Sequence, residues 1–282
     1  MRVYIIIPFH NEENTLTQML GSLVSQTNRP DKVLLVNDNS SDKSIDIANT
    51  YCANHDWIFK IDISSSDDHI PGSKVINAFY KGLEILDDDF DIICKFDADI
   101  ILPKNYMEAI VNCFALNPKI GIASGLLFIE KDGTWQYENI ASKTHVRGPI
   151  KAYRKACFEA IGGLKKTIGW DTIDTLLALY QNWEIHVQPD LKVKHLKPTG
   201  KAYSKNTQLL AGERWYQMRY GIVLTIIATI KTTVQQKNIH LLFNSIKGYY
   251  KARKHSVEPA VSIEEGKFIR NLRWKGIREK IF

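Results

Sequence analysis

The first hundred residues alternate continuous apolar runs with segments of helical periodicity. Four runs rich in β-branched and aromatic residues predict strands, at residues 2–7, 33–36, 57–63 and 90–96. Hydrophobicity that does not alternate along a strand indicates burial on both faces. Buried strands that alternate with helices predict an α/β fold, in which a Rossmann-like, mostly parallel sheet is flanked by helices.

The residues around these strands predict where the other elements begin and end. We expect Pro8 to end the first strand and Asn11 to cap the first helix, with Glu12 and Glu13 in its first turn. Beyond Asp99 the pattern is looser, and it predicts strands near residues 121–130, 135–138, 150–154, 183–188 and 191–195. Helices are predicted at residues 74–86, 155–161 and 171–181, and the residues from 206 onward are helical in character.

An uneven distribution of charge divides the chain near residue 200. The 282 residues suffice for one large domain, or for one domain with an extension. Residues 1–200 contain 21 Lys and Arg against 26 Asp and Glu, a charge of −5, whereas residues 201–282 contain 16 against 5, a charge of +11. This asymmetry indicates an acidic partner for a basic helical extension, and it argues against a uniformly basic nucleic-acid-binding protein.

The cysteines and the apolar runs indicate a cytoplasmic protein. The four cysteines form neither a CxxC motif nor a paired framework, so we expect reduced thiols rather than disulfides. The longest late apolar run, residues 221–230, has about half the length that a membrane helix needs. We therefore expect no segment that crosses a bilayer.

Acidic residues follow three of the predicted strands. Glu12 comes after the first strand, Asp38 after the second, and Asp97 and Asp99 after the fourth. Ligands of open α/β sheets bind at the carboxyl ends of the strands, where gathered carboxylates repel one another unless a cation lies among them. The Asp97-Ala98-Asp99 triplet suits Mg²⁺ or Mn²⁺, although such a triplet can also be a turn or a helix cap.

The order of several short motifs resembles a known family. The chain is similar, over about residues 1–197, to family 2 inverting glycosyltransferases of the GT-A fold, of the bacterial cell-surface glycan type. The resemblance is carried by the segments at residues 8–13 (PFHNEE), 37–42 (NDNSSD), 72–77 (GSKVIN), 97–99 (DAD), 162–164 (GGL) and 170–171 (WD). Neither the GxGxxG motif nor the Walker motif of competing nucleotide-binding folds is present.

The resemblance implies roles for individual residues in nucleotide binding. Pro8 and Glu12 would line a uridine pocket, and Asp38 would accept a hydrogen bond from the NH of the base. Lys74 would approach the ribose or the diphosphate, and Asp97 would contact the ribose. Residues 1–200 would thus form a nucleotide-sugar-binding and catalytic domain.

The same resemblance implies a divalent cation, Mg²⁺ or Mn²⁺, and a catalytic base. Asp99 and Asp97 would bind the metal, and His195 would be a last metal ligand, although a lone histidine is more often an ordinary core or surface residue.

Asp171 would be the base that takes the proton of the acceptor hydroxyl. The family usually has an acidic pair at this point, and here Trp170 replaces its first member. Asp171 could instead cap a helix, and Asp174 is a secondary candidate.

The basic extension predicts a contact with a membrane surface. Apolar residues at positions 268/269, 272, 276/277 and 281 form one stripe with a basic flank, as in interfacial helices. The alternative is that this stripe packs onto the domain. We expect peripheral contact with the inner face of the plasma membrane, where a lipid-linked acceptor would be available.

The resemblance therefore implies a metal-dependent hexosyltransferase (EC 2.4 class) in cell-surface polysaccharide biosynthesis. It would move a single sugar from a UDP-sugar donor to a glycan or lipid-linked glycan, with no nucleic-acid partner. A sugar-phosphate nucleotidyltransferase would use similar carboxylates, but it usually carries a Gly-rich basic loop after the first strand. A non-catalytic nucleotide-sugar-binding protein is the other alternative.

Overall fold

The computed structural model describes residues 1–65, 72–198 and 205–281. In chain order the elements are β1 (Val3–Phe9), α1 (Leu16–Val24), β2 (Lys32–Asp38), α2 (Ser44–Asn54), β3 (Ile58–Ile63), α3 (Ser73–Leu83), β4 (Ile92–Phe96), β5 (Ile100–Ile101), α4 (Tyr106–Leu116), β6 (Ile120–Lys131), β7 (Thr134–Tyr137), β8 (Ile150–Arg154), α5 (Lys155–Ala160), α6 (Trp170–Tyr180), β9 (Glu184–His195), α7 (Lys205–Gln217), α8 (Gly221–Gln236), α9 (His240–Lys254) and α10 (Ile263–Ile281). They fall into two compact units: β1 to α5 with β9, and α6 with α7 to α10.

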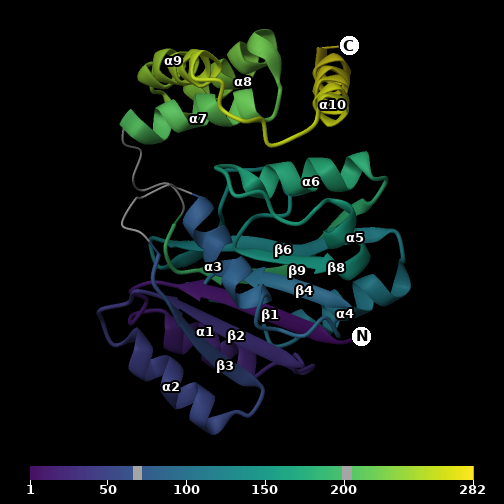
Figure 1. The fold of residues 1–282 in the computed structure, drawn as a ribbon. Helices are drawn as coiled ribbons and strands as arrows, with labels where there is room; N and C mark the ends of the chain where they lie inside the picture. Colours follow the sequence, from purple (N-terminus) through teal and green to yellow (C-terminus); the bar gives the residue numbers. More distant parts are fainter. Residues whose placement is uncertain (66–71, 199–204, 282) are drawn as a thin grey trace. The chain divides into compact units, whose positions relative to one another are not determined.

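One mixed sheet runs through the first unit (Figure 1). The strand order is β3-β2-β1-β4-β8-β6-β9-β5, and β7 pairs with β6. The strands β3, β2, β1 and β4 are parallel to their neighbours, whereas β8 is antiparallel to both β4 and β6. The α/β class predicted from the alternating strands and helices is confirmed, with the parallel pairs concentrated in the first half of the sheet.

The strands of the parallel half are buried on both faces, as their continuous hydrophobicity predicts. Ile5 and Ile7 of β1 belong to the main core with side chains of α1 and α4. Ile6, between them, lies on the other face, where α3 approaches so closely that a Cβ at Gly82 would lie 2.9 Å from the Ile6 side chain. Both faces of β1 therefore carry packing, and no position along it can be polar without cost.

Two predictions for the segment between β1 and α1 were wrong. Pro8 does not end the first strand but lies within β1, opposite Val36. Proline is tolerated there because β1 pairs with β4 only over Val3–Ile6, so the ladder to β4 needs no N–H from Pro8. Asn11 does not cap a helix, because its φ is 53° and the chain turns at Glu12 before α1 begins at Leu16.

The second unit is built from helices, as the sequence predicts for its C-terminal part. Helices α7 and α9 pack together, and α8 packs on α9. At the crossing of α7 and α9, a Cβ on Gly212 would lie 1.8 Å from the carbonyl oxygen of Ser245, and one on Gly248 would lie 1.9 Å from that of Leu209. The two backbones approach this closely because both glycines lack side chains.

No helix among residues 1–65, 72–198 and 205–281 combines the length and the apolar character that crossing a membrane requires. The domain boundary expected at residues 198–200 lies partly outside the described residues, as does the side chain of position 281. The division into domains 1–200 and 201–282 stays a prediction.

The α7–α9 crossing predicts opposite effects for two Gly→Ala substitutions in helix interiors of the second unit. Gly212→Ala should lower the free energy of unfolding by about 2 kcal/mol, because the new methyl group meets the Ser245 carbonyl in a packed crossing. Gly276→Ala, where a new Cβ meets nothing within 4 Å, should be neutral or stabilising by up to about 1 kcal/mol. Denaturant unfolding followed by circular dichroism measures both, and equal effects would contradict the crossing.

Candidate active site

The ends of neighbouring strands bring the predicted acidic residues to one region of the first unit. Asp38 is the last residue of β2, and Asp97 directly follows β4. Both strands are parallel to β1, so their carboxyl ends lie at the same edge of the sheet. The short strand β5, just after Asp99, pairs with β9, so that Ile100 lies opposite His195. The backbone N–H of Leu196 donates to the carbonyl oxygen of Asp99.

This pairing places Asp99 and His195 face to face. The Nε2 atom of His195 lies 3.6 Å from Oδ2 of Asp99, and both side chains are buried or nearly so. The other carboxylate oxygen of Asp99, Oδ1, is buried and has no hydrogen-bond partner among the described residues. A buried carboxylate oxygen without a donor is costly, and it indicates a place for a ligand with positive charge.

A buried glutamate orients the histidine. Nδ1 of His195 lies 3.0 Å from Oε2 of Glu138, which directly follows β7 and is 2% exposed. Because a carboxylate can only accept, Nδ1 carries the proton, and in the neutral ring Nε2 keeps its lone pair on the side of Asp99. Nη1 of Arg147 donates to the same oxygen of Glu138 at 2.5 Å. Sequence reasoning missed Glu138, since nothing in one strand's sequence reports contacts with residues dozens of positions away.

Burial and mutual repulsion shift the protonation of this pair. Burial, with the negative charge of Asp97, raises the pKa of the Asp99 carboxyl to about 6. Burial alone would lower the pKa of His195, but the hydrogen bond to Glu138 and the nearby carboxylates outweigh it, and that pKa is raised. The same negative field that favours a proton here would favour a bound cation.

Two buried lysines occupy neighbouring positions on β4 and β8, and one of them pairs with a carboxylate of the site. Lys95 of β4 is 2% exposed and forms an ion pair with Asp97. Lys151 of β8, which is fully buried, stands opposite Lys95 in the antiparallel register. Both were missed at the sequence level. The available signal was a lysine inside the otherwise apolar run of β4, because a buried lysine in a strand requires a compensating anion.

Three of the five predicted nucleotide-binding residues line one cavity of about 350 Å³, a size within the usual range for small-ligand sites. They are Pro8, Asp38 and Lys74, which come from β1, β2 and the first turn of α3. The backbone N–H of Ser65 donates to Oδ1 of Asp38 at 3.1 Å, and the Ser65 hydroxyl donates to Oδ2 at 2.8 Å. These bonds fix the carboxylate while leaving lone pairs for a further donor.

Glu12 does not line this cavity. Its Oε2 accepts from the hydroxyl of Thr15 at 2.5 Å and from Nζ of Lys197 at 2.6 Å. Lys197 lies two residues beyond His195, so this ion pair links the turn after β1 to the end of β9. The negative charge of Glu12 also contributes to the raised pKa of Asp99, which places the two carboxylates in one electrostatic neighbourhood.

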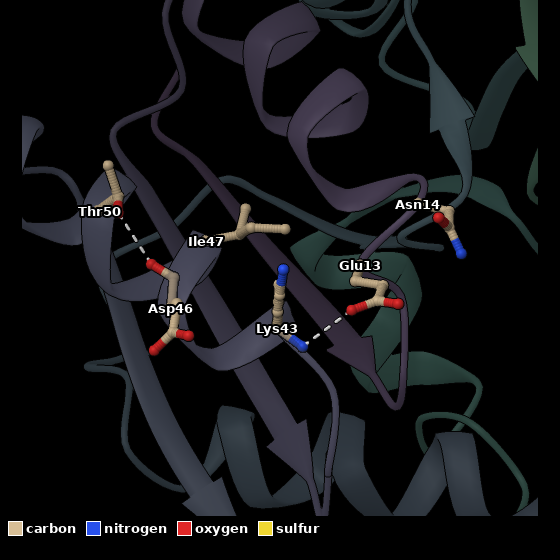
Figure 2. A pocket seen from close by; sticks show the side chains of 6 residues that line it. All are labelled: Glu13, Asn14, Lys43, Asp46, Ile47 and Thr50. Atoms are coloured by element: carbon tan, nitrogen blue, oxygen red, sulfur yellow. Dashed lines mark hydrogen bonds between the residues drawn. The ribbon is translucent and has the colours of Figure 1, made fainter.

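A larger hollow of about 500 Å³ lies between the turn after β1 and α2, and it contains none of the predicted site residues. Figure 2 shows the residues that line it. The backbone N–H of Lys43 donates to the carboxylate of Glu13, and the hydroxyl of Thr50 donates to the carbonyl oxygen of Asp46. We assign the site to the smaller cavity, because Pro8, Phe9 and Asp38, the residues at the carboxyl ends of β1 and β2, line it themselves.

The predicted base belongs to the second unit. Asp171 lies in the first turn of α6, and its side chain is partly exposed. Asp174, one turn later, is fully buried, and its Oδ1 accepts from the backbone N–H of Thr175 at 2.5 Å. A base must reach its substrate, so of the two Asp171 is the better candidate, and its role stays a prediction.

The residues present fit a divalent cation only in part. No group of three His, Cys, Asp or Glu side chains in the described ranges is arranged as a metal site. Asp99 and His195 nevertheless offer an unpartnered carboxylate oxygen and a ring nitrogen, whereas Asp97 is paired with Lys95. This matches Mg²⁺ and similar ions, which usually take one or two protein ligands and complete their shell with water and substrate phosphates.

The raised pKa of Asp99 predicts that the folding stability of the metal-free protein decreases as the pH rises. The folded state holds the Asp99 proton up to about pH 6, whereas the unfolded carboxyl releases it near the ordinary value of 3.8, so stability is lost as the pH rises between them. In EDTA at about pH 7.5, Asp99→Asn should raise the free energy of unfolding by about 2 kcal/mol, a gain that vanishes near pH 4. Denaturant unfolding checks this; the exposed Asp190→Asn is the control, and a gain that does not depend on pH would contradict it.

Comparison with known proteins identifies relatives along most of the chain. It is similar to the probable glycosyltransferase YdaM of Bacillus subtilis, at 23% identity over 275 residues, covering 88% of this chain and 62% of the relative. It is also similar to a poly-beta-1,6-N-acetyl-D-glucosamine synthase of Staphylococcus epidermidis, at 21% identity, covering 82% and 58%. The chain thus spans about 60% of the length of these curated relatives.

Solved structures share the fold. Staphylococcus aureus TarS 1-349 in complex with UDP-GlcNAc matches with a TM-score of 0.56 and 18% identity, over 76% of this chain and 67% of that one. The mannosyltransferase PcManGT from Pyrobaculum calidifontis, in complex with GDP-Man and Mn²⁺, matches with a TM-score of 0.58 and 14% identity, over 100% and 81%. The GT-A fold that the motifs predict is therefore confirmed.

The family model described as "Glycosyl transferase family 2" matches residues 4–162 of this chain. That match contains β1 to α5, and hence Asp38, Lys74, Asp97 and Asp99. Because it covers more than half of the chain, the protein belongs to glycosyltransferase family 2.

Proposed function

We propose that this protein is a metal-dependent, inverting glycosyltransferase that moves a single sugar from a UDP-sugar donor to a glycan or lipid-linked glycan. The observation that carries the proposal is the buried Asp99–His195 pair, whose orphaned carboxylate oxygen calls for a cation in the same unit as the Asp38 cavity. A metal-dependent transferase that releases a nucleoside diphosphate needs both features.

The cavity suits the nucleoside part of the donor. Pro8 and Phe9 supply apolar surface, and the fixed carboxylate of Asp38 would accept the ring NH of uracil. Lys74, at the start of α3, would face the ribose or the diphosphate with positive charge. Among proteins that share the fold, TarS has been solved with UDP-GlcNAc and PcManGT with GDP-Man, so a nucleoside-diphosphate sugar is supported as donor and the choice of UDP rests on Asp38.

Asp99 and His195, with Asp97, would hold Mg²⁺ or Mn²⁺ against the diphosphate. When bound, such an ion would act as a Lewis acid that neutralises the charge growing on the leaving diphosphate. Glu138 keeps the proton of His195 on Nδ1, so Nε2 stays available as a ligand. A mannosyltransferase that shares the fold has been solved with Mn²⁺, which supports the use of a divalent ion.

Inversion would require one displacement with a base. The acceptor hydroxyl oxygen would attack the anomeric carbon and form the new glycosidic bond. The bond from that carbon to the diphosphate oxygen would break, and its electron pair would leave with UDP. Asp171 would take the hydroxyl proton, because it is the partly exposed carboxylate at the start of α6 and Asp174 is buried.

The nucleotide assignment predicts a selective loss of UDP affinity. Asp38→Asn should raise the Kd for UDP by about tenfold or more, since a hydrogen bond to a charged acceptor is lost. Thermal shift with UDP, GDP, CDP and ADP, each with and without Mn²⁺, measures this and should show UDP as the best stabiliser. Asp46→Asn, in the hollow of Figure 2, is the matched control and should leave the UDP affinity unchanged. A preference for GDP, or no response to any nucleotide, would overturn the donor assignment.

The catalytic assignment predicts a loss of turnover without a loss of binding. Asp171→Asn should lower kcat by about a thousandfold and leave the Kd for UDP within about twofold, because a general base acts only in the chemical step. UDP release in the presence of acceptor glycans gives kcat, and Asp190→Asn is the control. Retained turnover in Asp171→Asn would remove this residue from the mechanism, and release of pyrophosphate would indicate a nucleotidyltransferase.

A further inference from the structure

Helix α8 in the second unit presents its apolar side to solvent. Its exposed positions follow helical spacing and form one stripe, the α8 stripe, made of Val223, Ile226, Ile227, Ile230 and Val234. The opposite side of the helix, which packs into the unit, carries Leu224, Thr225 and Thr229, all three almost completely buried. Most of the large aliphatic side chains of α8 are therefore exposed, and Leu224 is a buried exception.

The buried threonines are compatible with this orientation because their hydroxyl groups are satisfied inside the helix. Thr225 donates to the carbonyl oxygen of Gly221 at 2.8 Å, and Thr229 donates to that of Thr225 at 2.7 Å. The exposed isoleucines have no such compensation, because leaving apolar surface in contact with water is unfavourable in free energy. Contiguous apolar surface of this kind on a protein marks a contact with a partner or a membrane.

The charge around the α8 stripe is of one sign. No Asp or Glu occurs between Glu213 and Glu258, a segment that contains eight Lys and Arg. Most of these basic side chains are exposed, namely Lys231, Lys237, Lys247, Lys251, Arg253 and Lys254. Two further apolar side chains, Ile239 and Phe243, are exposed at the start of α9 and follow directly after α8.

Part of the stripe on α10, which was expected to reach a membrane, packs within the second unit. Ile269 is fully buried, and the ring of Phe268 contacts that of Tyr180 of α6 at 5.4 Å between centroids. Arg270 and Arg273 donate hydrogen bonds to Arg219 and Tyr220 of the same unit. Part of the α10 stripe is thus taken up by packing within the second unit, whereas most of the large aliphatic side chains of α8 are exposed.

We propose that the α8 stripe docks on an anionic lipid bilayer, with the helix in the plane of the surface. Hydrocarbon accepts the isoleucine side chains, and acidic headgroups attract the lysines around them. A second copy of the chain would fit less well, because it would bring eight like charges against the same basic segment. Nucleic acid would satisfy the charge but leave the apolar stripe in water.

Vesicle flotation of the full-length protein tests the proposal, using phosphatidylcholine with about one third phosphatidylglycerol, and phosphatidylcholine alone. We expect binding to the anionic vesicles only, weakening as salt screens the charges. The variant Ile226→Gln/Ile227→Gln/Ile230→Gln, which keeps good helix formers, should bind at least about tenfold more weakly. Lys231→Gln/Lys237→Gln should lose roughly fivefold for each charge removed.

The matched control removes exposed apolar side chains elsewhere. Ile85→Gln/Leu116→Gln changes residues of the first unit that are 64% and 85% exposed, and it should bind vesicles as the wild type does. Circular dichroism and the unfolding temperature must be unchanged in all variants. No donor or acceptor is added, so the result is independent of the proposed transferase activity.

Three results would overturn the proposal. The first is no flotation with anionic vesicles at low salt. The second is flotation that the triple isoleucine variant retains. The third is light scattering that shows a dimer which the triple variant dissociates, because the α8 stripe would then be covered by a second copy.

Discussion

Negative charge gathered in the first unit is the constraint on which the candidate site depends. Asp97, Asp99 and Glu138 are brought together by strand ends and by the pairing of β5 with β9. Each is balanced differently: Asp97 by a buried lysine, and Glu138 by Arg147 and His195. Asp99 alone keeps a buried oxygen without a donor among the described residues. The fold thus neutralises most of the charge itself and leaves a defined remainder for a ligand.

Only the parts of the site that lie at strand ends could be predicted from the sequence. Asp38 ends β2, and Asp97 and Asp99 come just after β4, so the rule that ligands bind at strand ends finds them. Glu138 and Lys95 could not be found in this way. The role of Glu138 depends on a partner from a distant strand, since it meets His195 across 57 positions. Lys95 pairs with the nearby Asp97, but its place opposite Lys151 depends on the antiparallel register of β4 and β8. Register between distant strands is set by tertiary packing, which one strand's sequence does not report.

For the helices of the second unit, too, the sequence of one element does not report its tertiary neighbours. Periodicity gives the faces of α8 correctly, because the aliphatic positions and the threonines fall on opposite sides. It does not say which face turns inward, and the usual assumption that the aliphatic face is buried fails here. In α10 the assumption holds, since Ile269 is buried. The difference lies in the neighbours that each helix meets: α8 packs on α7 and α9, whose backbones approach closely at Gly212 and Gly248, whereas α10 packs on α6 and α8.

Arg147 and His195 both donate to one oxygen of Glu138, and this sharing has a mechanical consequence. Arg147 lies in the connection between β7 and β8, whereas His195 ends β9. An oxygen that accepts two donors binds each more weakly than it would bind one alone. The buried guanidinium and the imidazole therefore share one acceptor, which couples the connection between β7 and β8 to the ring that faces Asp99.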